Sequence, residues 1–265
     1  MAYERTFHDI RIKSTDIEVR KISTKDLWQS LKEGYDDFNA RPSFGVLFLI
    51  LIYPLFALLL TLFLQGENLL YLAFPIVAGL TLLGPVLSVA LFEMSRRRER
   101  GLDLSWRSAF GFVHSASFAP ILALSIVMML LYVAWLYLAQ SLYFGLFGAD
   151  PPASLAEFGE RLISTRPGVA LILYGNVLGV LFAFTALAIS VVAFPLLLDK
   201  PVSMLTAMGT SIRAVATNLY VMLLWGVIVT VLLAVGAVVF LVGLAAVLPI
   251  LGHATWHLYR KLVES

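Results

Sequence analysis

The stretch "AVATNLYVMLLWGVIVTVLLAVGAVVFLVGLAAVLPILGHATWHLY", residues 214–259, contains no Asp, Glu, Lys or Arg. As one straight helix it would be about 69 Å long, roughly twice the hydrocarbon thickness of a bilayer. We therefore expect two membrane spans here, 219–234 and 239–258. A tight turn around Val235, Gly236 and Ala237 would join them.

The remaining sequence has the same apolar character. Of the 265 residues, 60% are hydrophobic and 14% are charged, and the mean hydropathy is +0.89. This balance leaves too little polar surface to cover a soluble domain of that size. Four further stretches reach the roughly 20 apolar residues that a membrane helix needs, at 44–64, 69–92, 118–142 and 168–194. The sequence therefore predicts an all-α, polytopic membrane protein with six transmembrane helices.

Lysine and arginine fall almost entirely on one side of this predicted topology. With six spans both termini share one side, and 17 of the 19 basic residues lie there. The opposite side keeps only Arg161 and Arg166. Because basic loops are retained in the cytoplasm, we expect a multi-pass protein of the bacterial inner membrane with cytoplasmic N- and C-termini.

The chain also resembles itself. A shift of 78 residues places Trp28 on Trp106, and the stretches "PVLSVALFEMSR" and "PILGHATWHLYR", which begin at Pro85 and Pro249, align without a gap. We interpret this as three copies of an interfacial amphipathic helix followed by a transmembrane hairpin.

This repeat sets the expected domain organisation. A polar cytoplasmic segment, 1–22, precedes a single membrane domain, 23–265. The predicted repeats of that domain are 23–102, 103–199 and 200–265.

Three stretches resemble a known family: "STKDLWQSLKEGYDDFNARPSFG" at 23–45, "GPVLSVALFEMSRRRERG" at 84–101 and "AFPLLLDKPVSMLTAMGTSIRAVATN" at 193–218. In the last stretch a span ends in Pro and an acidic residue, and a helix with small and Ser positions then leads to Asn and the next span. The whole chain is similar to the bacterial six-helix integral membrane proteins of the family called domain of unknown function 2189. The resemblance implies an inner-membrane, six-span fold, and it brings no established activity and no catalytic residues.

His253 and His257 are the first candidates for a ligand site, because a spacing of four places both imidazoles on one face of a helix. With His114 and Glu93 they would offer nitrogen and oxygen ligands to a transition metal, and each histidine could instead ligate a haem. The other interpretation is the polar end of a membrane helix, where aromatic and basic residues meet the lipid headgroups. We favour this second interpretation and predict no metal and no cofactor.

Arg96, Arg97, Arg98 and Arg100 directly follow the second predicted span. Such clusters attract anionic phospholipid at about 1 kcal/mol per basic residue, and they also keep a loop in the cytoplasm. We expect both effects, with headgroup contact at the cytoplasmic face.

Asn176 is the main polar residue at depth, between Gly175 and Gly179. Small residues beside a carboxamide favour a close helix contact with one hydrogen bond, and a substrate ligand is the second interpretation.

The sequence excludes several functional classes. It has no cysteine, which rules out disulfides, thiolate metal sites and Cys nucleophiles, and its net charge of +2 gives no support for nucleic-acid binding. No nucleophile elbow, phosphate-binding glycine loop or metalloprotease helix is present. We therefore predict a non-enzymatic scaffold, accessory or assembly factor that contacts the lipid bilayer and a membrane-protein partner or further copies of itself. The alternative is a small transporter or lipid-handling permease with a cavity among the three hairpins, lined by Ser88, Asn176 and Thr185.

Overall fold

The computed structural model describes residues 17–40, 58, 69–238 and 243–263. Within these ranges the regular elements are all helices. One isolated antiparallel bridge pairs Val19, before the first helix, with Val263, after the last described helix. The predicted all-α class is therefore confirmed. The first predicted span, 44–64, and most of the predicted N-terminal segment, 1–22, lie outside the described residues.

The helices follow the chain in three groups. The first group is α1 (Thr24–Ala40), η2 (Leu70–Leu72), α3 (Ala73–Leu80), η3 (Thr81–Leu83), α4 (Gly84–Leu87) and α5 (Val89–Glu99). The second is α6 (Trp106–Ala109), η4 (Gly111–His114), α7 (Phe118–Phe147), α8 (Leu155–Ser164), α9 (Arg166–Ser190) and α10 (Ala193–Asp199). The third is α11 (Met204–Thr217), α12 (Leu219–Val238) and α13 (Leu244–Leu262).

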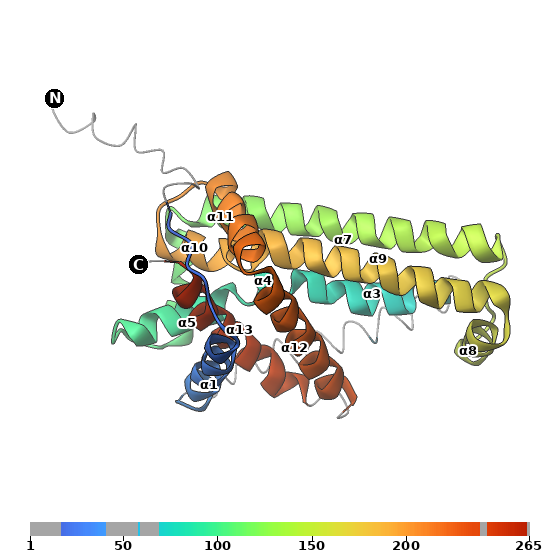
Figure 1. Ribbon diagram of the computed structural model, residues 1–265, viewed down its shortest axis with the longest axis horizontal. Coiled ribbons are helices and arrows are strands. Elements are labelled where there is room, and N and C mark those ends of the chain that lie inside the picture. The colour runs from blue at the N-terminus through green and yellow to red at the C-terminus, as the bar shows by residue number, and fades with distance from the viewer. Residues whose placement is uncertain (1–16, 41–57, 59–68, 239–242, 264–265) are drawn as a thin grey trace.

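Two sets of helices diverge from one end of the molecule (Figure 1). The long helices α7 and α9 lie side by side, α3 runs along them, and α8 lies across their far end. The pair α12 and α13 leaves at an angle, and α1 packs against α13. At the shared end α5 contacts α10 and α13, and α10 contacts α11, so this end joins the two sets.

Four helical segments among the described residues are long and apolar enough to cross a membrane: Leu70–Glu99, Phe118–Phe147, Arg166–Asp199 and Leu219–Val238. They correspond to the second to fifth predicted spans. The sixth predicted span, 239–258, overlaps α13, which is not one of the four. The first half of α13 is apolar, but its second half contains Gly252, His253 and His257. Most residues of this second half are buried.

The predicted turn at residues 235–237 is wrong, because α12 continues to Val238. No polar residue marks the end of this helix, so composition alone misplaces it. Two glycines bring the ends of α12 and α13 together: a Cβ on Gly243 would lie 2.8 Å from the Cα of Gly236. This contact leaves no room for a larger residue, and it explains why Gly stands at both positions.

The amphipathic helices predicted at the start of the three repeats differ from one another in the structure. In the first and third copies they are the continuous helices α1 and α11, but in the second copy the segment is divided into the four-residue α6 and the short η4. The division falls at Phe110 and Gly111, where glycine weakens a helix. The three copies are therefore unequal in this element.

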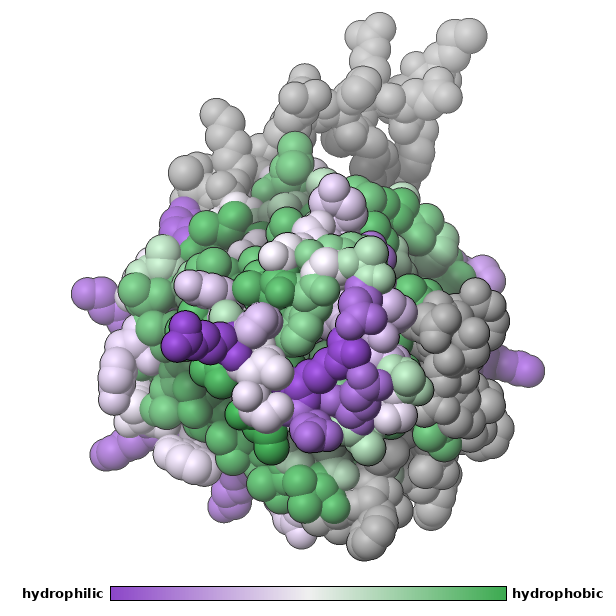
Figure 2. All heavy atoms as spheres, turned by 90° about the vertical axis from the view of Figure 1, so that its right-hand side faces the viewer, coloured by the Kyte–Doolittle hydropathy of each residue, from purple (hydrophilic) through white to green (hydrophobic). Residues whose placement is uncertain are grey.

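The exposed surface of the long helices is apolar. Leu130 and Tyr137 of α7, Val180 of α9 and Tyr220 of α12 are each more than 60% exposed. Figure 2, which views the end that carries α8, shows hydrophobic atoms around a compact hydrophilic patch. At the opposite, shared end the charged side chains Asp37 and Glu93 are buried instead. Apolar groups outside and charges inside are the arrangement expected when lipid is the solvent.

Candidate functional site

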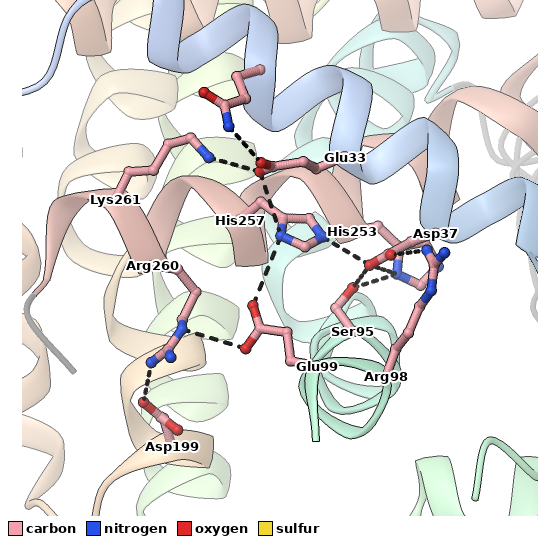
Figure 3. A network of polar contacts seen from close by, with 11 residues as sticks. Glu33, Asp37, Ser95, Arg98, Glu99, Asp199, His253, His257, Arg260 and Lys261 are labelled. Carbon is pink, nitrogen blue, oxygen red and sulfur yellow. Dashed lines mark hydrogen bonds and ion pairs between the residues drawn. The ribbon is translucent and has the colours of Figure 1, made fainter. Parts of the chain in front are cut away.

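The main polar feature of the structure is a network of charged side chains at the shared end, called here the ionic layer (Figure 3). Its members come from α1, α5, α10 and α13: Glu33, Asp37, Ser95, Arg98, Glu99, Asp199, His253, His257, Arg260 and Lys261. Four segments that are far apart in the sequence are therefore joined at one level of the fold.

Asp37 of α1 lies at the centre of the layer. Its Oδ2 is 2.9 Å from Nε2 of His257 and 2.5 Å from Oγ of Ser95, and its Oδ1 forms an ion pair with Arg98. α1 places Asp37 there because it packs very closely on α13. A Cβ on Gly34 would lie 2.5 Å from the backbone nitrogen of Ala254. Only a residue without a side chain permits this approach.

A directional chain of hydrogen bonds links His253 to Asp37. The Ser95 hydroxyl donates to the Asp37 carboxylate, so its oxygen is left to accept from Nδ1–H of His253, which is 2.8 Å away. His253 is 2% exposed, and its Nε2 has no partner among the described residues. A pocket of about 10 Å³ lies beside Asp37, Ser95 and His253. That volume is about the minimum for one water molecule, so the place is too small for a substrate.

His257 connects Asp37 to the rim of the layer. Its Nδ1 lies 3.6 Å from Oε2 of Glu33 and 3.9 Å from Oε1 of Glu99. Each of these carboxylates also meets a cation of α13: Lys261 lies 2.7 Å from Glu33, and Nε of Arg260 lies 3.4 Å from Glu99. The last two turns of α13 therefore bind α1 on one side and α5 on the other.

Asp199, at the end of α10, is the second centre of the layer. It accepts a hydrogen bond of 2.8 Å from the Tyr259 hydroxyl, and it pairs with Arg100 at 3.0 Å and with Arg260 at 3.3 Å. Three helix ends thus meet at one carboxylate that is itself buried. The end of the third candidate span is fixed to α5 and α13 by charge as well as by packing.

The electrostatics of the layer favour ionised Asp37. Burial would raise the pKa of this carboxyl, but the hydrogen bonds from His257 and Ser95 outweigh burial and lower the pKa from 3.8 to about 2. The carboxylate is therefore charged at any physiological pH, and the donors around it are aligned to that charge.

The four arginines predicted to meet lipid headgroups are all paired inside the protein. Arg96 and Arg97 lie 2.7 Å and 3.5 Å from the carboxylate of Glu93, and Arg98 and Arg100 pair with Asp37 and Asp199. Arg96 also donates to the Leu198 carbonyl at 2.6 Å. Arg98 and Arg100 keep 40% and 50% of their side chains exposed. The cluster therefore holds helices together, an internal role that its sequence position did not indicate.

The predicted metal ligands are not brought together. His253 and His257 share a face of α13, but Glu93 turns to Arg96 and Arg97, and His114 is exposed in η4. In the part of the chain that the structure describes, no group of three or more His, Cys, Asp or Glu side chains is placed to hold a metal ion. The two histidines instead meet Asp37.

Asn176 lies on the exposed side of α9 and donates to the carbonyl of Ile172 in its own helix at 2.7 Å. Among the described residues, the hydrogen bond of its side chain stays within α9. A different asparagine makes long-range contacts: Asn218, between α11 and α12, accepts from the Ile22 amide at 2.8 Å and donates to the Arg20 carbonyl at 3.0 Å. Asn218 thereby fixes the segment that leads into α1.

The role of Asp37 was not predicted from the sequence. One signal was present: Glu33 and Asp37 are four residues apart on α1, and His257 and Lys261 are four residues apart on α13. Acidic residues on one helix and possible donors at the same spacing on another can match across two helix faces, but the spacing does not say which helices pair.

The comparisons agree with the membrane character of the fold. No curated protein and no solved structure matches the chain. The sequence model of one family matches residues 73–199, from α3 to the end of α10. The family is described as predicted integral membrane protein, DUF2189, and it is the family that the sequence resembles.

Proposed function

We propose that this integral membrane protein is a scaffold, accessory or assembly factor of the bacterial inner membrane, without enzymatic activity of its own. One observation carries the proposal. The buried carboxylates of the ionic layer are each satisfied by cations or donors from other helices. A reactive site directs such groups toward a space that a substrate can enter, whereas these groups are directed at one another.

The ionic layer suits a platform of fixed shape. Asp37 and Asp199 bind together α1, α5, α10 and α13, and partners of each carboxylate come from two or more of these helices. A network of this kind loses several kcal/mol when one partner is removed, because the remaining charge is left buried. We infer that the rigid end presents surfaces to lipids and to a membrane-protein partner or a second copy of the chain.

The proposed topology has six spans in three repeats, with the ionic layer at the cytoplasmic face. Two features support it. The first is the charge asymmetry of the loops, which favours a topology with both termini on the basic side. The final helices of the three predicted repeats, α5, α10 and α13, all end in the ionic layer, and Gly252 of α13 packs directly on Leu91 of α5.

The rival proposal, a transporter or lipid-handling permease, needs a cavity lined by Ser88, Asn176 and Thr185. Each of these side chains donates to a carbonyl of its own helical segment, at 2.9, 2.7 and 2.8 Å. Asn176 and Thr185 are also exposed on the outside of α9. These positions favour the scaffold over the permease.

Quantitative purification from native membranes tests the proposal. The full chain, extracted with a mild detergent, is expected to carry a membrane-protein partner, or a second copy, at a fixed ratio. Asp37→Asn should lower that ratio because it loosens the platform. Asp36→Asn, the same change at the exposed neighbouring residue, should leave it unchanged. A folded chain that purifies alone and carries solute across liposome membranes would establish the permease instead.

A further inference from the structure

The face of α1 opposite the ionic layer combines exposed aromatic and basic side chains. Leu27, Ser30, Gly34 and Asp37 are the buried residues of this helix. On the other side, residues at helical spacing form a continuous line, called here the outward stripe: Lys25, Trp28, Lys32 and Tyr35. Trp28 is 63% exposed and Tyr35 is 52% exposed.

The residues around the stripe change character in order. At about 100° per residue, Trp28 and Tyr35 lie next to the half-buried Leu31 and Phe38, and Lys25 and Lys32 come next around the helix. Gln29 and Asp36 follow on the far flank, and both are exposed. The order from apolar to aromatic, basic and finally neutral or acidic is that of a helix half-immersed in a membrane surface.

The contacts of α1 place it level with the ends of the candidate spans. Just before α1, Ile22 and Arg20 bind Asn218, the residue that precedes the span α12. Farther along α1, Asp37 binds Arg98 near the end of the first described span. The ends of spans are where lipid headgroups lie, and Trp and Tyr concentrate at that depth.

The charges of the stripe are available to a ligand. Within the described ranges, neither Lys25 nor Lys32 has a hydrogen bond or ion pair with another side chain. In contrast, the arginines at the end of the first described span form ion pairs with carboxylates of the protein: Arg96, Arg97, Arg98 and Arg100. Lys25 and Lys32 of α1 are therefore exposed positive charges that no carboxylate of the described residues neutralises.

We propose that the outward stripe of α1 is a binding surface for anionic phospholipid, with Trp28 and Tyr35 in the headgroup region and Lys25 and Lys32 on the phosphates. The inference deepens the proposed scaffold function, since it names the lipid and the residues through which the platform rests on the membrane. Because the ionic layer holds α1 to α13, the stripe is presented at a fixed height.

Site-directed spin labelling of the full chain tests the position of the stripe. The sequence contains no cysteine, so single variants can be labelled directly. In nanodiscs of phosphatidylglycerol and phosphatidylcholine, labels at Trp28→Cys and Tyr35→Cys should collide more with oxygen than with a water-soluble nickel chelate. Labels at the matched positions Gln29→Cys and Asp36→Cys should show the opposite preference. Stripe labels that prefer the nickel chelate, or that are shielded from both reagents by a protein surface, would overturn the proposal.

The charge of the stripe needs a separate measurement. Lipid retained by the purified chain can be measured by native mass spectrometry after reconstitution in equal amounts of the two lipids. Lys25→Gln and Lys32→Gln should each lower the preference for phosphatidylglycerol about fivefold, equivalent to about 1 kcal/mol. The control Lys21→Gln, before α1, should change it little. An unchanged preference in the double variant would refute the lysine contacts. Both experiments use the isolated chain, so their failure is distinguishable from the absence of a partner.

Discussion

Nε2 of His257 lies 2.9 Å from Oδ2 of Asp37, although 220 positions separate the two residues along the chain. The contact closes α1 on the last helix of the protein. His257 also faces Glu33 and Glu99, and Lys261 and Arg260 neutralise those two carboxylates. A histidine that sequence spacing offers as a metal ligand is therefore part of the connection between the two ends of the fold.

Removal of the central carboxylate should destabilise this connection. Asp37→Asn takes away the charged partner of Arg98 and His257, and we expect a loss of about 1.5–3 kcal/mol of unfolding free energy, since hydrogen bonds to a charged group are lost. Thermal unfolding of the detergent-solubilised chain measures the change. Asp36→Asn, one residue earlier and exposed, should alter stability little. Equal effects of the two substitutions would mean that the ionic layer does not hold α1.

The same carboxylate predicts a dependence of stability on pH. Its pKa is about 2 in the folded protein and near 3.8 when unfolded, so its stabilisation is complete above about pH 4 and is lost as the pH falls toward 2. The expected contribution is about 2 kcal/mol. The difference in melting temperature between wild type and Asp37→Asn should therefore narrow as the pH falls from about 4 toward about 2. A constant difference would show that another group determines the effect.

The close approach of α1 and α13 predicts a steric effect. Gly34→Ala places a Cβ 2.5 Å from a backbone nitrogen that cannot move independently, so the helices must separate, at a cost of about 1–3 kcal/mol. Gly175→Ala is the matched control, because a Cβ there meets nothing within 4 Å. That substitution should leave stability unchanged or raise it slightly, because Ala favours a helix. A neutral Gly34→Ala would contradict the packing described for α1.

The two asparagines should respond differently to the same substitution. Asn218→Ala removes the contacts to Ile22 and Arg20, so limited proteolysis of the segment before α1 should accelerate. Asn176→Ala removes a hydrogen bond within α9 and should not change that cleavage. If both variants resist protease as the wild type does, Asn218 does not hold the segment.

Apolar periodicity predicted much of the fold. Uncharged stretches of sufficient length predicted the second to fifth spans. These features depend on neighbours in the sequence. The end of α12 was misplaced because one glycine in an apolar helix does not distinguish a turn from a close helix contact.

The ionic layer could not be predicted in the same way. Arg98 lies 61 positions from Asp37, and Arg100 lies 99 positions from Asp199. Charges beside a membrane span satisfy the topology rule whether they meet lipid, water or another helix. Only the packing of α1, α5, α10 and α13 selects the last outcome. Asn176 is an example of the opposite error. Its apolar sequence neighbours indicated a buried contact, but in the structure its side chain is exposed on α9.

The proposed topology puts the ionic layer and the loop that contains α8 at opposite faces of a bilayer. Single cysteines at Asp36→Cys of α1 and Glu160→Cys of α8, both exposed positions, can be treated with a membrane-impermeant maleimide in intact cells whose outer membrane has been permeabilised. We predict immediate labelling at 160, and labelling at 36 only after the inner membrane is opened. Labelling of both positions from the same side would contradict the account.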